Sequence, residues 1–223
     1  MRQHPSRGPI ECNHRNRTFT AVTKSTPPLG HTARAVAESG TRPYPSQWER
    51  HLVLGDDWKV FARPVRPDDE PLILHLLQHV CKEDLRLRFF DSIKEFSHPF
   101  LVRLTRLDYA RAMAFVAFDE TSGDILGVVR VHRGPTGDSG EYAILLRSDL
   151  KGRGLGWALT QMIIEYGKSE GLKRIFGQVL EENSVMLKMC RELGFEVKTN
   201  PEDRGLCEVT LVLKGPLEDK MSL

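Results

Sequence analysis

The sequence predicts an α/β fold in which a mixed, mostly antiparallel central sheet is flanked by about four helices. Two observations predict it. Segments with the two-residue period of strands alternate with segments whose period is roughly 3.6 residues, in the order β-α-α-β-β-β-α-β-α-β-β. The 223 residues, 40% hydrophobic and 28% charged, are enough for one domain of ordinary size with flanking segments.

Composition and proline content set the expected domain boundaries. Residues 1–41 show no hydrophobic period, and residues 1–50 hold eight Lys or Arg against three Asp or Glu, which predicts a disordered basic tail. Residues 42–57 are expected to be a proline-containing linker and domain entry, and residues 58–214 the folded domain. Residues 215–223 are expected to form a C-terminal tail.

Charge and hydropathy exclude several classes of protein. The chain after residue 50 is mildly acidic, so a nucleic-acid partner is not expected. No stretch approaches the roughly 20 apolar residues that span a bilayer, so no membrane partner is expected. The chain start lacks an apolar signal core, which favours a cytoplasmic location.

The first half of the domain contains three expected strands and two expected helices. Asp68 and Asp69 offer a cap for a helix that continues to about Val80. The run 112–118 is continuously apolar, which suits a strand covered on both faces. The elements in this half are a strand at 58–63, helices at 68–80 and 83–90, and a hairpin of strands at 112–118 and 125–131.

In the second half of the domain, expected strands and helices follow one another in turn. Leu155, Leu159, Met162, Ile163 and Tyr166 share one helical face, and Gly171 ends that helix. The remaining elements are strands at 141–147, 174–180, 195–198 and 207–213, with a helix between Asn183 and Gly194 and the last strand closing the sheet.

A glycine-rich loop joins the strand at 141–147 to the helix that follows. Its glycines allow close approach of backbone N–H groups to an anion, and the first turn of the helix leaves N–H donors unpaired. The loop lacks the Lys-Ser/Thr ending of a Walker loop and comes too late for a dinucleotide fold, which leaves CoA, or a plain tight turn. The expected pyrophosphate site consists of Lys151, Gly152, Arg153, Gly154, Leu155, Gly156 and Trp157.

The loop and the segment that follows it resemble the GNAT family of N-acetyltransferases. Lys151, Gly154 and Gly156 fill the family pattern of Arg or Gln, two residues, Gly, one residue, then Gly or Ala, with Lys as a mild departure. Downstream, Asn183 opens a helix that ends in Glu192-Leu193-Gly194-Phe195. The resemblance implies a GNAT fold, splayed strands at the CoA site, and acetyl-CoA as co-substrate without a metal.

The same resemblance implies further donor contacts. Leu145, Leu146 and Arg147 would supply backbone contacts to the acyl-pantetheine, which lies in the opening between strands as if it were a strand itself. Asn183 would bond the pantetheine arm, although a plain helix cap is also a sufficient role for it.

Several segments are closer to the acetyltransferase domain of Pat-type bacterial protein lysine acetyltransferases. They include 42–45, 63–70, 87–90, 107–109 and 141–152. This resemblance implies that the acceptor is a lysine of a protein, with an acyl-CoA synthetase as a candidate partner.

Two residues are candidates for catalysis. Glu141 begins the strand beside the loop and shares a face with Ala143 and Leu145, so it could act as general base, and it matches the catalytic position of Pat-type enzymes. Cys190 stands where many relatives have a Tyr that protonates the leaving thiolate, but a buried structural cysteine is the commoner case.

Other interpretations remain open at this stage. An enzyme of the same fold acting on a small amine, or a non-catalytic acyl-CoA-sensing module, is compatible with the same motifs. His75 and His79 have helical metal-site spacing but no carboxylate-rich motif, so no metal is expected. Five arginines fit either contacts with a CoA phosphate or an acidic protein, or a solvated surface: Arg86, Arg88, Arg103, Arg106 and Arg111.

Overall fold

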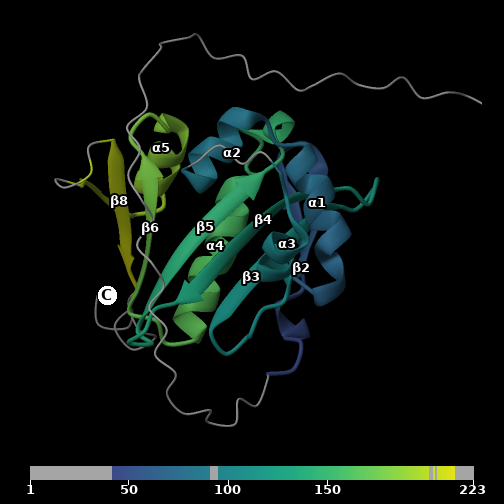
Figure 1. The fold of residues 1–223 in the computed structure, drawn as a ribbon, viewed down its shortest axis with the longest axis horizontal. Helices are drawn as coiled ribbons and strands as arrows, with labels where there is room; N and C mark the ends of the chain where they lie inside the picture. Colours follow the sequence, from purple (N-terminus) through teal and green to yellow (C-terminus); the bar gives the residue numbers. More distant parts are fainter. Residues whose placement is uncertain (1–41, 91–94, 201–202, 204, 214–223) are drawn as a thin grey trace, which may run out of the picture.

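A central sheet runs through the domain in the order β1-β2-β3-β4-β5-β6-β8-β7 (Figure 1). The computed structural model describes residues 42–90, 95–200, 203 and 205–213. The strands are β1 (Arg50–Leu54), β2 (Trp58–Pro64), β3 (Ala112–Asp119), β4 (Ile125–Arg133), β5 (Ser139–Leu146), β6 (Arg174–Leu180), β7 (Glu196–Thr199) and β8 (Leu206–Val212). The helices are α1 (Glu70–Gln78), α2 (Lys82–Phe89), α3 (His98–Thr105), α4 (Leu155–Ser169) and α5 (Ser184–Glu192). Among these neighbours β5 and β6 are parallel, and the other pairs are antiparallel.

Helices cover both faces of the sheet. Figure 1 shows α1 and α3 in front of the sheet and α4 behind it. Ala114 and Val116 of β3 belong to the hydrophobic cluster beneath α1, α2 and α3, whereas Met113 and Phe115 belong to the cluster with α4 and α5. The continuous apolar run of β3 therefore serves two cores, as the sequence predicted, and each fully buried large side chain contributes about 1.5–3 kcal/mol.

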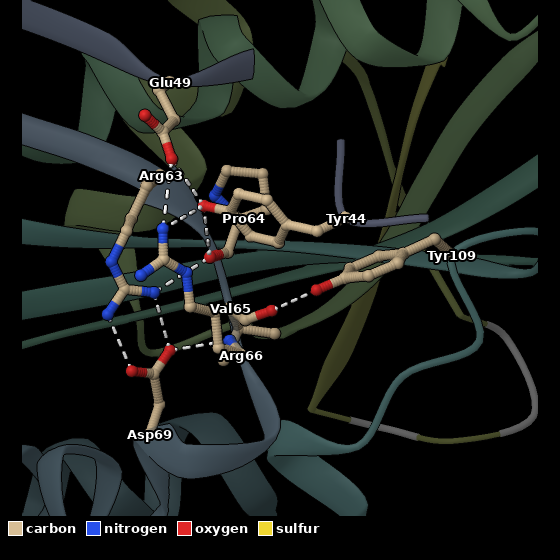
Figure 2. Close-up of polar contacts among 8 residues, drawn as sticks. All are labelled: Tyr44, Glu49, Arg63, Pro64, Val65, Arg66, Asp69 and Tyr109. Carbon is tan, nitrogen blue, oxygen red and sulfur yellow. Dashed lines mark hydrogen bonds and ion pairs between the residues drawn. The ribbon is translucent and has the colours of Figure 1, made fainter. Parts of the chain in front are cut away.

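The turn between β2 and α1 is built on a buried ion pair (Figure 2). The guanidinium of Arg63 donates two hydrogen bonds, of 2.8 and 2.7 Å, to the carboxylate of Asp69. The same carboxylate accepts the backbone N–H of Arg66 at 2.7 Å. The two paired side chains are 11% and 3% exposed. Their charges and hydrogen bonds fix where α1 begins relative to the sheet.

The segment before β1 docks against this turn. The guanidinium of Arg66 lies 4.6 Å from the centre of the Tyr44 ring and bonds Glu49 at 3.2 Å. The hydroxyl of Tyr109, which precedes β3, donates to the carbonyl oxygen of Val65 at 2.5 Å (Figure 2). Residues far apart in sequence thus converge on one end of α1.

The structure differs from the sequence-based element order in three places. The strand β1 lies inside the segment 42–57, which the sequence assigned to a linker and domain entry, and it pairs along its length with β2. The helix α3 occupies a stretch that was expected to be a loop. The strand β8 does not close the sheet at its edge but lies between β6 and β7. The predicted tails at 1–41 and 215–223 lie outside the described residues.

Within the described part of the chain, the structure holds no helix with the length and apolarity that a membrane crossing requires.

Candidate active site

The strands β5 and β6 separate part-way along their length. They are paired at three positions, Ser139 with Arg174, Gly140 with Ile175, and Glu141 with Phe176. Beyond Glu141, β5 continues to Leu146 and remains paired with β4 on its other side. Alternate backbone N–H and C=O groups of a strand point to opposite sides. The stretch of β5 after Glu141 therefore turns backbone polar groups towards a gap in the sheet.

Side chains alternate across β5 at this gap. Glu141, Ala143 and Leu145 project towards α1, α2 and α3, and Leu145 belongs to the cluster on that face. Tyr142 projects to the other face and belongs to the cluster with α4 and α5. Gly177 of β6 lies against Tyr142, because a Cβ there would stand 3.1 Å from the carbonyl oxygen and the ring. Absence of that Cβ lets the two strands approach closely where they begin to part.

The glycine-rich loop lies between the end of β5 and the start of α4. Gly152 and Gly154 have positive φ angles of 78° and 84°, which glycine adopts without the strain of a side chain. Gly154 is the N-cap of α4, and no side chain caps the first turn. The N–H groups of Leu155, Gly156 and Trp157 belong to this uncapped turn. An uncapped, electrically positive helix start of this kind suits a phosphate group.

The charged side chains of the loop are engaged by the protein. Lys151 forms an ion pair with Asp84 of α2, which also accepts a 2.5 Å hydrogen bond from the hydroxyl of Ser148. The guanidinium of Arg153 lies 3.9 Å from the centre of the Trp58 ring. The sequence analysis expected Lys151 and Arg153 to add positive charge for an anion. In the structure these two side chains also contact Asp84 and Trp58, which links the loop to α2 and β2.

Asp84 was not among the residues singled out from the sequence. It lies within the charged stretch Lys82-Glu83-Asp84, which has the composition of a solvated helix start. Its side chain is nevertheless 7% exposed, because it faces Ser148 and Lys151 across 64 and 67 residues of sequence. No local signal marks such a long-range contact.

Asn183 precedes α5, and Gly156 lies in the first turn of α4. The side-chain oxygen of Asn183 accepts the backbone N–H of Met186 at 3.2 Å, which confirms the predicted cap of α5. The amide nitrogen of Asn183 takes no part in this cap. A Cβ at Gly156 would lie 3.4 Å from both Leu146 and Met189, so α4 begins in close contact with β5 and α5. A longer side chain at position 156 would fill the space where β5 faces α5.

Cys190 lies in the core between α5 and the sheet. Its side chain is 0% exposed, and its Sγ is 3.0 Å from the hydroxyl oxygen of Tyr142. Burial raises the pKa of the Cys190 thiol, and burial together with Cys190 raises the pKa of Tyr142 well above its usual value. Both groups are therefore protonated at neutral pH. Cys190 is a hydrogen-bonded core residue in this structure.

Glu141 stands at the point where the strands separate. Its side chain is exposed, and its Cα neighbours are His132 on β4 and Phe176 on β6. Its negative charge acts on Arg88 of α2 and Arg130 of β4. An exposed carboxylate at the base of the gap can accept a proton from a group that approaches from the α1–α3 face.

Sequence comparison agrees with this arrangement. The model of the acetyltransferase (GNAT) family matches residues 79–195, which are more than half of the chain and include α2, β5, the loop and α5. The chain belongs to the GNAT family of acetyltransferases. As a GNAT acetyltransferase it is an acyltransferase, and acetyl-CoA is its co-substrate.

Pat acetyltransferases are among the proteins to which this GNAT acetyltransferase is similar. An acetyltransferase of Pseudomonas aeruginosa is 28% identical over 152 residues, which are 67% of this chain and 82% of that protein. Acetyltransferase Pat of Mycolicibacterium smegmatis is 29% identical over 135 residues, which are 60% of this chain. The matched part spans 40% of the length of that Pat protein. The crystal structure of the GNAT domain of S. lividans PAT has a TM-score of 0.71 and 27% identity, and the match covers 77% of this chain and 100% of that domain.

The fold is the predicted GNAT fold, with a mixed, mostly antiparallel sheet between helices. Within the described residues, no group of three or more His, Cys, Asp or Glu side chains is arranged to hold a metal ion.

Proposed function

We propose that this GNAT acetyltransferase moves the acetyl group of acetyl-CoA to the side-chain amine of a lysine in a protein, with Glu141 as general base. The observation that carries the proposal is the separation of β5 from β6 immediately after Glu141. A thioester lying in the gap would have its carbonyl carbon within reach of an amine that approaches the same carboxylate.

The donor is held mainly by backbone groups in this proposal. The diphosphate accepts hydrogen bonds from the amides of the loop 151–154 and the first turn of α4, at Leu155, Gly156 and Trp157. The pantetheine arm lies along Leu145, Leu146 and Arg147 in the place of a missing strand. The amide nitrogen of Asn183 donates to the same arm while its oxygen caps α5.

The chemical step needs a base because a lysine amine is mostly protonated at neutral pH. Its reference pKa near ~10.4 means that deprotonation at pH 7 costs about 4–5 kcal/mol. Glu141 accepts that proton, the amine nitrogen attacks the thioester carbonyl, and a backbone N–H near Leu145 or Leu146 stabilises the oxyanion. The attacking nitrogen then gives up its excess proton to solvent as the C–S bond breaks, and CoA leaves as a thiolate that takes a proton from solvent.

The resemblance to Pat-type enzymes supports a protein lysine as the acceptor. The motif segments that carry it lie on both the donor side, at 141–152, and the acceptor side, at 63–70 and 87–90. An acyl-CoA synthetase is the first acceptor to test, because Pat-type enzymes modify a catalytic lysine of such proteins.

The experiment measures CoA release and acetylated lysine by mass spectrometry for the wild type and for Glu141→Gln. The acceptors are an acyl-CoA synthetase, a free polyamine and no acceptor. We expect turnover of the synthetase to fall by about 10²-fold or more in Glu141→Gln, because general-base catalysis of this kind contributes 10²–10⁴-fold. Calorimetry should give the same acetyl-CoA affinity for both proteins.

The matched control is Glu165→Gln, which makes the same chemical change at an exposed position of α4. It should retain wild-type turnover. Near-normal turnover in Glu141→Gln would exclude the general-base role. Acetylation of the polyamine but not of the synthetase would exclude the synthetase as the substrate. Tight binding of acetyl-CoA with no reactive acceptor would favour a sensing module.

A further inference from the structure

A pocket on the α1–α3 face of the sheet contains two arginines among apolar side chains. Nine of its lining residues are apolar and come from α1, α2, α3 and the strands β3, β4 and β5; the other two are Arg88 and Arg130. Ala143 and Leu145 are part of this lining. They belong to the stretch of β5 that has separated from β6. The pocket therefore adjoins the gap from the side on which an acceptor would approach.

The register of the sheet sets Arg130 beside Glu141. Arg130 lies opposite Ala143, and Glu141 lies opposite His132, so Arg130 and Glu141 are diagonal neighbours on adjacent strands. Such diagonal positions are about 7–8 Å apart at Cα, within reach of long side chains. Arg88 approaches from α2, and Arg88, Arg130 and Glu141 influence one another electrostatically.

Neither arginine has a carboxylate partner among the described residues. Three other arginines with little exposed surface form ion pairs with carboxylates. These pairs are Arg63 with Asp69 at 2.7 Å, Arg133 with Glu170 at 3.1 Å, and Arg147 with Asp149 at 3.0 Å. Arg88 instead has its guanidinium 4.8 Å from the centre of the Phe89 ring. The pocket thus brings two positive charges together with one negative charge, that of Glu141.

The excess of positive charge in the pocket is unfavourable when no acceptor is bound. Burial, with a smaller effect of Arg130, lowers the pKa of Arg88 to about 10, and burial lowers the pKa of Arg130 as well. Both groups remain protonated at neutral pH. A partly buried guanidinium without a partner loses hydration that a ligand carboxylate can replace, and its planar fork matches a carboxylate with two parallel hydrogen bonds.

We infer that the acceptor carries a carboxylate beside the amine that it presents, and that Arg88 and Arg130 bind this carboxylate while Glu141 faces the amine. The inference rests on the proposed function and narrows it. On a protein, the acceptor is a lysine with an Asp or Glu side chain next to it. On a free amino acid, the α-carboxylate would supply the same chemistry.

The test compares two peptides that differ in one functional group. Both contain one lysine, flanked by Asp in one peptide and by Asn in the other, and kcat/KM is measured for each with saturating acetyl-CoA. We expect the wild type to prefer the Asp peptide by about 10- to 100-fold, the range of a hydrogen-bonded contact to a charged group. In Arg130→Gln and Arg88→Gln this preference should collapse, so that the ratio of kcat/KM for the two peptides falls to within about threefold of one.

Two further variants separate recognition from structure. Arg130→Lys keeps the charge but not the fork, and should retain part of the preference. Arg174→Gln changes an exposed arginine at the paired start of β6 and should leave the preference intact. Because Arg130 has no carboxylate partner among the described residues, Arg130→Gln should not lower the melting temperature below that of the wild type.

The outcomes are distinguishable from those of the proposed function. Equal rates on the two peptides in the wild type would overturn the carboxylate inference and leave lysine acetylation standing. Leucine and leucinamide form the second pair of acceptors. If leucine reacts, leucinamide does not, and neither peptide does, the carboxylate inference stands while the protein substrate falls. If none of the four is acetylated, the carboxylate inference falls, and the assay with the acyl-CoA synthetase decides the proposed function by itself.

Discussion

The charges of Arg63 and Asp69 are tolerated in the interior because each is the partner of the other. Their two hydrogen bonds and the third bond from the backbone of Arg66 satisfy the carboxylate almost completely. Removing either member leaves the other as a buried charge without its counter-charge in a low-dielectric site, which is costly. The consequence of a substitution here is therefore a loss of stability rather than of chemistry.

We expect Asp69→Ala to lower the free energy of unfolding by about 3–5 kcal/mol, because it leaves the buried charge of Arg63 without its carboxylate partner. Urea titration followed by circular dichroism measures this loss. Its neighbour Asp68 is exposed, so Asp68→Ala should change the same quantity by less than about 0.5 kcal/mol. Equal losses in the two variants would show that the ion pair does not stabilise the turn.

Cys190 is a buried free cysteine of α5. Its burial and its contact with Tyr142 favour a structural role, so Cys190→Ala should keep turnover within about threefold and lose roughly 0.5–3 kcal/mol of stability. Acetyl transfer kinetics and thermal unfolding measure the two effects. Cys207→Ala, at another buried free cysteine, is the control. A drop in turnover near 10²-fold in a folded Cys190→Ala protein would instead identify Cys190 as the proton donor to the leaving thiolate.

Sequence alone identified individual residues where their signal was local. The cap by Asn183 follows from its position before an amphipathic run, and it is confirmed. Glu141 could be singled out because its strand leads into the glycine-rich loop, although its role stays a prediction. Asp84 and Arg130 could not be singled out, because their partners and neighbours are fixed by α2 and β4 packing against β5.

A helix or strand with a strong hydrophobic period can be predicted from the sequence alone. The helix α4 buries Leu155, Leu159, Met162, Ile163 and Tyr166, the face that the sequence predicted. The strand β1 was missed because its five residues follow proline-rich sequence and are at most half-buried. The helix α3 was missed because it has eight residues and Pro99 in its first turn, which also fits a loop.

The loop before α4 yields a prediction about one glycine. Gly154 has φ of 84° with open space around its missing Cβ, so Gly154→Ala strains the backbone by roughly 1–2 kcal/mol without a clash. We expect the strain to turn the first amides of α4 away from the diphosphate and to weaken acetyl-CoA binding by about tenfold, as measured by calorimetry.

The control lies at the other end of the same helix. Gly171 has φ of 72° and equally open surroundings, so Gly171→Ala should lose similar stability while acetyl-CoA affinity is unchanged. If both variants bound acetyl-CoA as tightly as wild type, the diphosphate would have to lie elsewhere.

For the whole molecule, the sequence gives the class of fold but not the pairing of distant strands. The resemblance to a known family supplied the expectation of splayed strands, and periodicity did not. The three-residue pairing of β5 with β6 depends on how β4, α4 and α5 position those strands, and no single segment encodes it. The placement of β8 between β6 and β7 cannot be predicted from the sequence for the same reason.

The position of β8 has a consequence for biosynthesis. On the ribosome, β6 and β7 are synthesised before β8, which lies between them in the sheet, so the edge of β6 that β8 covers stays unpaired until residues 206–212 have emerged. Open edges of this kind recruit other chains. Chaperone capture of stalled intermediates should therefore peak just before residues 206–212 emerge and subside once they insert.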